Sequence, residues 1–429
     1  MREFFFFDDH DKESLRKFLE LEKPWEYDFT FAAEYENPEP TLSELKALDT
    51  YERWLTLAAC RPMSEKDAER YPKAKKFADE CAEKYGRLRS PDGSPDASGR
   101  FYRLPQKIYD TLWGWRRYED ERYGSTVSFG NKFACDTMNT VERVLCELYG
   151  HMAAAQLPND GDISFGHLLE CSRTTDNFLG ELTDIFAGMG MKEYVESCRT
   201  LGNFVLVPEG FEEYRAANFG GRWDTSLENI RITQLSEKKF RKYVNVFFLW
   251  DYTRAADSRY TVRETRPDKP SEIDKITNPD AAEKIMRFLF RLACVIKRRG
   301  VFMTAMALFK LADIREYEAL RFDLAYDGYC FNDMSEAARF VLNEYEKSLP
   351  TRAAELLSKL TLPLYGLDDI AELCKNGAEL EFIGENEEFA ALEYAVTRER
   401  HDGGTERIRF LTAECMDDVD LAAGWTGFD

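Results

Sequence analysis

The sequence predicts a mainly α-helical protein of the α+β class, with a helical core and a small antiparallel β-sheet near the C-terminus. Three observations support this prediction. Apolar residues recur at helical spacing along most of the 429 residues, helix-start signals precede several of these stretches, and strand-like alternation begins only at about residue 378. Hydrophobic residues make up 44% of the chain and charged residues 32%, so it can bury a core and still present a polar surface to water.

The N-terminal part is expected to contain a short buried strand followed by helices. Residues 1–8 contain a run of four phenylalanines, and residues 11–22 place apolar side chains at helical spacing. The segment Thr41–Glu44 has the pattern of a capping box, in which the hydroxyl and the carboxylate each accept a hydrogen bond from a first-turn N–H. It predicts one helix from this box to about Cys60.

A further helix and a clear loop follow. Ser64 is expected to start the helix, Pro72 to kink it and Gly86 to end it. The segment Ser90–Gly99 consists almost entirely of Ser, Pro, Asp and Gly, which favour turns, and predicts a flexible loop. These patterns divide the chain into four predicted regions: an N-terminal strand and helical region at 1–89, the flexible loop at 90–99, a main helical domain at 100–367 and an acidic C-terminal β-hairpin region at 368–429.

The central part of the chain is expected to be helical. The strongest start signal is Asn278–Pro279–Asp280, because Asn caps helices and Pro is favoured at the first helical position. Apolar residues then continue at helical spacing until Gly300, where we expect this helix to end. Further helices are predicted at 139–155, 175–187, 192–199, 335–349 and 351–360.

The residue spacing changes near the C-terminus. Segments 378–383, 390–398 and 407–412 alternate apolar and polar residues as strands do. His401–Gly404 contains the Asp-Gly pair that a tight hairpin turn requires. Together these patterns predict the small antiparallel sheet.

Charge is distributed unevenly within the net value of −21. Residues 368–429 contain 17 acidic and 5 basic residues, a net of −12, whereas residues 231–300 contain 17 basic and 9 acidic residues, a net of +8. Opposite fields of this size lower their energy by approaching each other. We therefore expect the acidic C-terminal region to lie against part of the basic segment.

The basic segment 231–300 also interleaves aromatic residues with cations. This combination suits single-stranded nucleic acid, because aromatic rings stack on bases and cations contact phosphates. The alternative is an ordinary amphipathic stretch whose aromatics form core and whose cations pair with the acidic remainder. Both interpretations concern the same aromatic residues: Phe240, Tyr243, Trp250, Tyr252 and Tyr260.

The sequence favours a cytosolic location and no membrane span. No stretch approaches the 18 or so consecutive apolar residues of a membrane-spanning helix. The first residues lack the apolar run and cleavage site of a signal peptide. The ten cysteines are spread singly without any CxxC pair, which favours buried, reduced thiols.

One polar cluster is predicted at a helix N-terminus. In the segment FGNKFACDTMN, the side chains of Asn131, Lys132 and Asp136 precede the helix predicted from Asn139. Free N–H groups at such a terminus favour an anion. The alternative is that Asp136 or Asn139 simply caps the helix.

The order of several short motifs resembles that in a family of uncharacterised bacterial proteins with a DTMN segment, a GNF–P segment and a helix ending in RG. The resemblance spans about Tyr123–Leu311 and implies a shared fold and polar cluster, but no reaction. At Phe211–Tyr214 the chain has Glu-Glu where the family pattern leads us to expect Asn. The matching elements are KFACDTMNT at 132–140, LGNFVLVP at 201–208, Arg215, WDTSL at 223–227 and KRRG at 297–300.

Catalytic and metal-binding templates give little support for an enzyme. The patterns GxSxG, GxGxxG and the P-loop are absent from the sequence. His167 and Cys171 could share a metal, but one imidazole and one thiol do not complete a zinc site, so core packing is favoured. The acids around His10, at Asp8–Asp11, are better explained as the solvated start of a helix. We expect neither a metal nor a cofactor.

Two functional hypotheses remain open. In the first, the chain is a bacterial cytosolic interaction or regulatory protein with a protein partner and a polar anion-binding cluster. In the second, it is an enzyme that acts on a nucleotide or nucleic acid, with Asp136 and Asp224 as metal-binding or general-base carboxylates and with Lys132, Arg215 and Arg298 as phosphate contacts. The enzyme is favoured if one open cleft joins Asp136, Asn203, Arg215, Asp224 and Arg298, and disfavoured if these residues are buried and paired with each other. The candidate ligand-binding residues are Asn131, Lys132, Asn139, Asn203, Arg215 and Arg298.

Overall fold

The computed structural model confirms a mainly helical fold with a small antiparallel sheet near the C-terminus. The chain forms two compact units, one of Met1–Ile230 with Thr265–Leu289 and the other of Arg231–Glu264 with Phe290–Asp429. The loop predicted at 90–99 lies outside the described residues. The structure describes residues 9–29, 31, 40–86, 108, 111–113, 144–148, 164–174, 191–205, 226–256, 259–262, 279–326, 329–375, 378–399 and 404–424.

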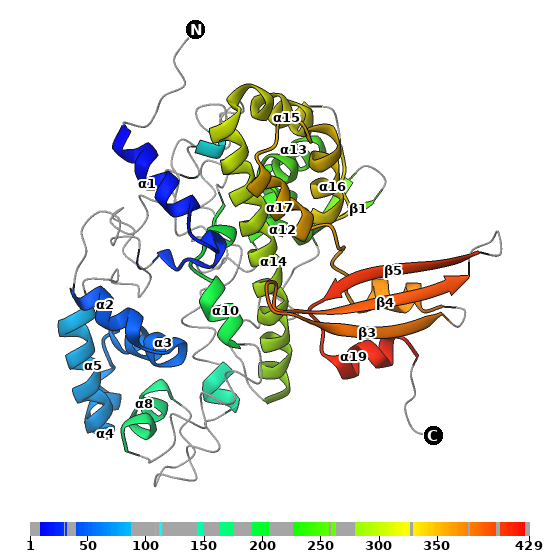
Figure 1. Ribbon diagram of the computed structural model, residues 1–429. Helices are drawn as coiled ribbons and strands as arrows, with labels where there is room; N and C mark the ends of the chain where they lie inside the picture. The colour runs from blue at the N-terminus through cyan, green and yellow to red at the C-terminus, as the bar shows by residue number, and fades with distance from the viewer. Residues whose placement is uncertain are drawn as a thin grey trace. The chain divides into compact units, whose positions relative to one another are not determined.

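The described part of Met1–Ile230 in the first unit consists of short helices (Figure 1). The strand predicted at 1–8 and the helix predicted at 175–187 lie outside the described residues, and residues 144–148 of the helix predicted at 139–155 are helical. The named elements are α1 (Asp9–Leu19), η1 (Pro24–Glu26), α2 (Pro40–Ala47), α3 (Thr50–Ala59), α4 (Glu65–Arg70), α5 (Pro72–Tyr85), α8 (Phe165–Thr174), α10 (Met191–Ser197), η6 (Leu201–Asn203) and α12 (Ser226–Asn229).

The prediction of one continuous helix from Thr41 to Cys60 is wrong. The chain leaves the helix at Leu48 and Asp49, so that α2 and α3 are separate. The reason is local: the Asp49 side chain accepts a hydrogen bond from the Glu52 N–H at 2.8 Å and thereby caps a new helix. Because apolar residues keep their helical spacing across Leu48 and Asp49, the sequence pattern does not reveal the break between the two helices.

The helix start predicted at Ser64 is confirmed, but the kink predicted at Pro72 is wrong, because Pro72 begins a separate helix. The hydroxyl of Ser64 accepts from the Asp67 N–H at 3.1 Å, and Pro72 occupies the start of α5, where its missing N–H does no harm. The predicted kink is therefore a complete break between two helices. Glu170 of α8 supplies a tertiary cap, because its Oε2 accepts from the Ala74 N–H at 2.6 Å.

The second unit combines helices with both sheets (Figure 1). Neither α15 nor the β1–β2 hairpin is predicted by the sequence patterns above. The elements from η7 onward are η7 (Ile230–Gln234), α13 (Glu237–Val246), η8 (Trp250–Tyr252), β1 (Thr253–Ala256), β2 (Arg259–Val262), α14 (Pro279–Ala312), α15 (Ile314–Tyr326), α16 (Met334–Glu344), α17 (Thr351–Lys359), α18 (Leu367–Leu373), β3 (Glu379–Asn386), β4 (Ala391–Glu399), β5 (Thr405–Thr412) and α19 (Met416–Ala422). Helix α14 begins in the first unit and continues in the second from Phe290.

Helix α14 begins at Pro279 as predicted, but the end predicted at Gly300 is wrong. The helix continues to Ala312 because every side chain of Val301–Ala307 is fully buried. That burial outweighs the loss of about 1 kcal/mol that a glycine causes within a helix. None of the helices that the structure describes combines the length and apolar character needed to cross a membrane.

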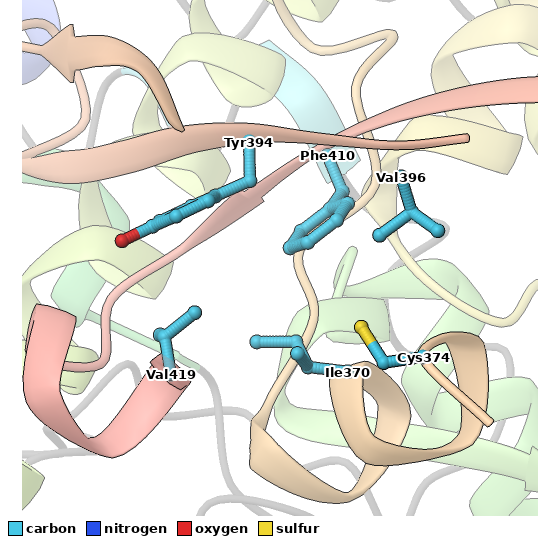
Figure 2. Close-up of a cluster of buried hydrophobic side chains, with 6 residues drawn as sticks. All are labelled: Ile370, Cys374, Tyr394, Val396, Phe410 and Val419. Carbon is cyan, nitrogen blue, oxygen red and sulfur yellow. The ribbon is translucent and has the colours of Figure 1, made fainter. Parts of the chain in front are cut away.

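The C-terminal sheet confirms the three predicted strands. Strand β4 lies between β3 and β5, and both neighbours are antiparallel to it (Figure 1). A bulge interrupts β3 between Phe382 and Gly384. One face of the sheet packs against α18 and α19, where Tyr394 and Phe410 meet Ile370 and Val419 (Figure 2). This region therefore has an apolar core of its own.

A buried amide holds several elements of the second unit together. Asn245 of α13 donates through Nδ2 to the carbonyls of Leu324 and Tyr329, at 3.0 and 2.8 Å. Its Oδ1 accepts from Trp250 Nε1 at 2.9 Å and from the Tyr260 hydroxyl at 3.0 Å. One side chain thus joins α13 to α15, η8 and β2 with all of its hydrogen-bonding capacity used.

Candidate ligand pocket in the second unit

The structure describes two of the predicted site residues, Asn203 and Arg298, and they belong to different units. Asn203 is fully buried, and its Nδ2 donates to the Cys198 carbonyl at 2.6 Å, which closes the turn after α10. The predicted cluster stays a prediction, because its other members lie outside the described residues: Asn131, Lys132, Asp136, Asn139, Arg215 and Asp224.

Arg298 lies at the centre of a buried polar network. Its Nε donates to Asp251 Oδ2 at 2.6 Å, and both side chains are fully inaccessible to water. Its Nη1 donates to the Leu362 carbonyl at 3.1 Å, while Asp251 Oδ1 accepts from the Met334 N–H at 2.8 Å. The guanidinium therefore connects α14 to η8, α16 and the segment after α17. In this arrangement it stabilises the fold and presents no surface to a phosphate.

Asp333 caps α16 next to this network. Its Oδ1 accepts from the N–H groups of Ser335 and Glu336, at 2.8 and 3.1 Å, and from the Ser335 hydroxyl at 2.5 Å. Burial raises the pKa of Asp333, and the nearby charge of Asp251 raises it further. The helix cap is therefore an aspartate whose charged form is disfavoured by its surroundings.

We expect Asp333→Asn to remove a pH-dependent loss of stability. Because the pKa of Asp333 is raised on folding, the folded protein binds more protons between the ordinary pKa of an aspartate and the raised one. The free energy of unfolding should therefore fall as pH rises through that window. Asparagine keeps an oxygen acceptor for the helix cap but has no charge to bury.

Urea denaturation between about pH 4 and pH 8 checks this prediction. The stability of Asp333→Asn relative to the parent should increase with rising pH, whereas exposed Glu355→Gln should show no such trend. Parallel stability curves for the parent and Asp333→Asn would contradict the raised pKa.

A pocket of about 480 Å³ opens beside this network and belongs wholly to the second unit. It is lined by residues of the β1–β2 hairpin, α14, the start of α18 and the two residues that follow β5. This volume lies in the range of small-molecule sites. Its apolar wall includes Val262, Val295 and Leu364.

Two ion pairs border the pocket. Arg254 of β1 pairs with Asp369 of α18, and Arg291 of α14 pairs with Glu414 at 3.2 Å. Both pairs join the basic segment 231–300 to the acidic C-terminal region, as the charge distribution predicts. The arginines are partly exposed, so each pair contributes only about 0–1 kcal/mol to stability.

The charged groups of the pocket retain binding capacity. A guanidinium has five N–H donors, and within the described residues Arg254 and Arg291 each use one in a side-chain hydrogen bond. The Nε of Arg291 is buried and has no hydrogen-bond partner among the described residues. Asp368 is exposed and forms no ion pair with any described residue. With respect to the described residues, the pocket therefore offers free cationic donors and a free carboxylate.

Tyr365 adds a further polar group to the lining. Burial raises the pKa of Tyr365, and the charges of Asp333 and Asp369 raise it further. Its hydroxyl is therefore protonated near neutral pH and can donate a hydrogen bond. The ring packs against Phe410 at 5.2 Å between centroids, which fixes its position against the C-terminal sheet.

The residues considered for a metal in the first unit form core instead. His167 is buried and stacks on Tyr71 at 5.6 Å between ring centroids. Burial raises the pKa of the Cys171 thiol to about 11, which disfavours the thiolate that a metal requires. Within the described residues, no group of three or more His, Cys, Asp or Glu side chains could hold a metal ion.

The aromatic residues of the basic segment are also core. Their side chains are at most 4% exposed, so bases of a single strand cannot stack on them in this structure. Lys297, Arg298 and Arg299 are likewise buried and add no charge to the surface. The nucleic-acid hypothesis therefore loses its stacking groups, which were Phe240, Tyr243, Trp250, Tyr252 and Tyr260.

The pocket residues are not among those predicted from the sequence. They come from four separated segments, and none of these segments carries a recognisable motif. No family model, curated protein or solved structure matches the chain. The resemblance to the bacterial family stays a prediction.

Proposed function

We propose that the protein is a regulatory protein that binds a small zwitterionic molecule, such as an α-amino acid, in the pocket of the second unit. One observation carries this proposal: among the described residues, Arg254 and Arg291 with spare N–H donors and Asp368 with an unpaired carboxylate border one cavity with an apolar wall. A ligand with one anionic and one cationic end matches both charges, and its apolar part can contact Val262 and Leu364.

The existing ion pairs prepare the two arginines for this role. Asp369 and Glu414 each hold one guanidinium in place, so less side-chain entropy is lost when a ligand carboxylate binds to the remaining donors. A carboxylate is a good partner for the planar donors of arginine, and Asp368 can accept a hydrogen bond from an ammonium group.

The position of the pocket supports a regulatory role. Its lining combines the β1–β2 hairpin and α14 with residues that lead into α18 and follow β5. A ligand that bridges these elements adds to the ion pairs between them. Binding should therefore stabilise the contact of the C-terminal helices and sheet with the remainder of the second unit.

Calorimetric titration of the full-length protein with the twenty amino acids tests this function. At least one amino acid should bind, and Arg254→Ala and Arg291→Ala should each weaken it at least tenfold, equivalent to about 1.4 kcal/mol. Exposed Arg315 has no side-chain hydrogen bond to a described residue, so Arg315→Ala is the matched control and should leave binding unchanged.

Two further ligands test the need for both charges. Glutarate, which has two carboxylates, and putrescine, which has two ammonium groups, should each bind at least tenfold more weakly than the best amino acid. Asp368→Asn should weaken the amino acid and leave glutarate unchanged. The proposal fails if no amino acid binds, or if Arg315→Ala reduces affinity as much as the two pocket variants do.

A further inference from the structure

Strand β3 forms an open edge of the C-terminal sheet. Within the described residues, the strand order is β3-β4-β5, and the backbone of Glu379–Asn386 pairs with β4 alone (Figure 1). Its other edge therefore presents unpaired N–H and C=O groups, which can pair with another extended chain. Every side chain of this strand is exposed or half-buried.

The two faces of strand β3 differ in the polarity of their side chains. Leu380 and Phe382 lie on the face that packs against the helices, and Phe382 contacts Tyr394 at 5.3 Å between ring centroids yet remains 42% exposed. Glu379 and Glu381 lie on the opposite face and are exposed, and Glu381 also pairs with Arg407 of β5 at 2.7 Å. An added strand would lie about 4.8 Å from β3, with its side chains beside these residues.

We propose that β3 accepts an extended segment of a partner protein as a fourth strand of the sheet, and that this segment alternates basic and apolar residues. Its basic side chains would lie beside Glu379 and Glu381, and its apolar side chains would cover Leu380 and Phe382. The bulge after Phe382 limits regular pairing to the first part of the strand.

The charge of the edge argues for a basic partner and against a second copy of this chain. Residues 379–388 contain five acidic residues and no basic residue. Two β3 strands side by side would bring glutamates of both copies onto the same face, and like charges in neighbouring strands are destabilising. A basic segment instead meets charges of the opposite sign.

A synthetic peptide tests the pattern directly. A rhodamine-labelled peptide of alternating lysine and valine should bind the full-length protein in a fluorescence-anisotropy titration. A peptide with the same composition but all lysines first should bind at least tenfold more weakly, because it cannot place cations on one face only. Failure of the alternating peptide to bind would overturn the proposal.

Backbone pairing is tested with N-methyl groups, which remove N–H donors without changing the charge. Of two peptides methylated on alternate residues in opposite phase, one should lose at least tenfold in affinity, because only one phase directs its N–H groups toward β3. Equal affinity of both methylated peptides and the parent peptide would show that charge alone attracts the peptide, and would overturn strand addition.

Charge reversal on the protein locates the contact. Glu379→Lys combined with Glu381→Lys should weaken the alternating peptide at least tenfold. The control, Glu346→Lys with Glu355→Lys, changes the net charge equally at exposed positions of the same unit and should change affinity less than twofold. Equal effects of the two double variants on peptide affinity would contradict the proposal. It would also be contradicted if sedimentation showed a dimer that Glu379→Lys with Glu381→Lys dissociates, because β3 would then be covered by a second copy of the chain.

Discussion

Replacement of Arg298 by alanine is expected to lower the free energy of unfolding by about 3–5 kcal/mol, because removal of one partner leaves the other as an unpaired charge in the interior. The partner is Asp251, whose side chain is fully buried and receives the Arg298 Nε–H at 2.6 Å. The variant also leaves the Leu362 carbonyl without the Nη1 donor and opens a cavity beside Phe389.

Urea denaturation followed by circular dichroism measures this effect, with Arg315→Ala as the control on an exposed arginine. The double variant Arg298→Met with Asp251→Asn should be more stable than Arg298→Ala, because it leaves no buried charge and asparagine still accepts from the Met334 N–H. If Arg298→Ala unfolds at the same urea concentration as the parent, the buried ion pair does not form in solution.

Local capping signals explain which helix starts could be predicted. Ser64 and Pro279 act through bonds or dihedral angles within one turn, so the sequence alone determines them. Helix ends depend more on distant contacts. Gly300 normally favours an end, but the burial of Val301–Ala307 continues α14 beyond it. The periodic spacing of apolar residues likewise hides the cap at Asp49.

The pocket could be predicted only in outline. The opposite net charges of 231–300 and 368–429 indicate that these segments approach, and the pairs of Arg254 with Asp369 and of Arg291 with Glu414 confirm it. A count of charges does not distinguish exposed arginines from buried ones. Arg298 is an example, because it counts as a surface cation in the sequence but pairs within the core.

The edge of the C-terminal sheet illustrates the same limit. Alternating residues predict β3, β4 and β5, but the order of the strands requires the register of the pairs. Only that order shows that β4 is central and that β3 has a free edge in the described structure. The strand order therefore places the acidic residues of β3 at an edge that can pair with another strand, which the composition alone does not show.

Asn245→Ala is expected to destabilise the protein by about 2–5 kcal/mol, because each buried polar group that loses its partner costs about 1–3 kcal/mol.

The reason for so large an effect is that one amide serves four groups. Without it, the indole N–H of Trp250 and the hydroxyl of Tyr260 lose their acceptor, and the carbonyls of Leu324 and Tyr329 lose a donor. Burial raises the pKa of Tyr260, so its hydroxyl cannot escape this loss by ionising near neutral pH.

A double-variant cycle distinguishes this network from simple loss of packing. Trp250→Phe removes the indole N–H, so Asn245→Ala in that background should cost less than it does in the parent protein. Lys238→Ala, at an exposed position of the same helix, should change stability by no more than about 0.5 kcal/mol. Additive effects of Asn245→Ala and Trp250→Phe in urea denaturation would mean that the hydrogen bond between them contributes nothing, and that the amide acts only by filling space.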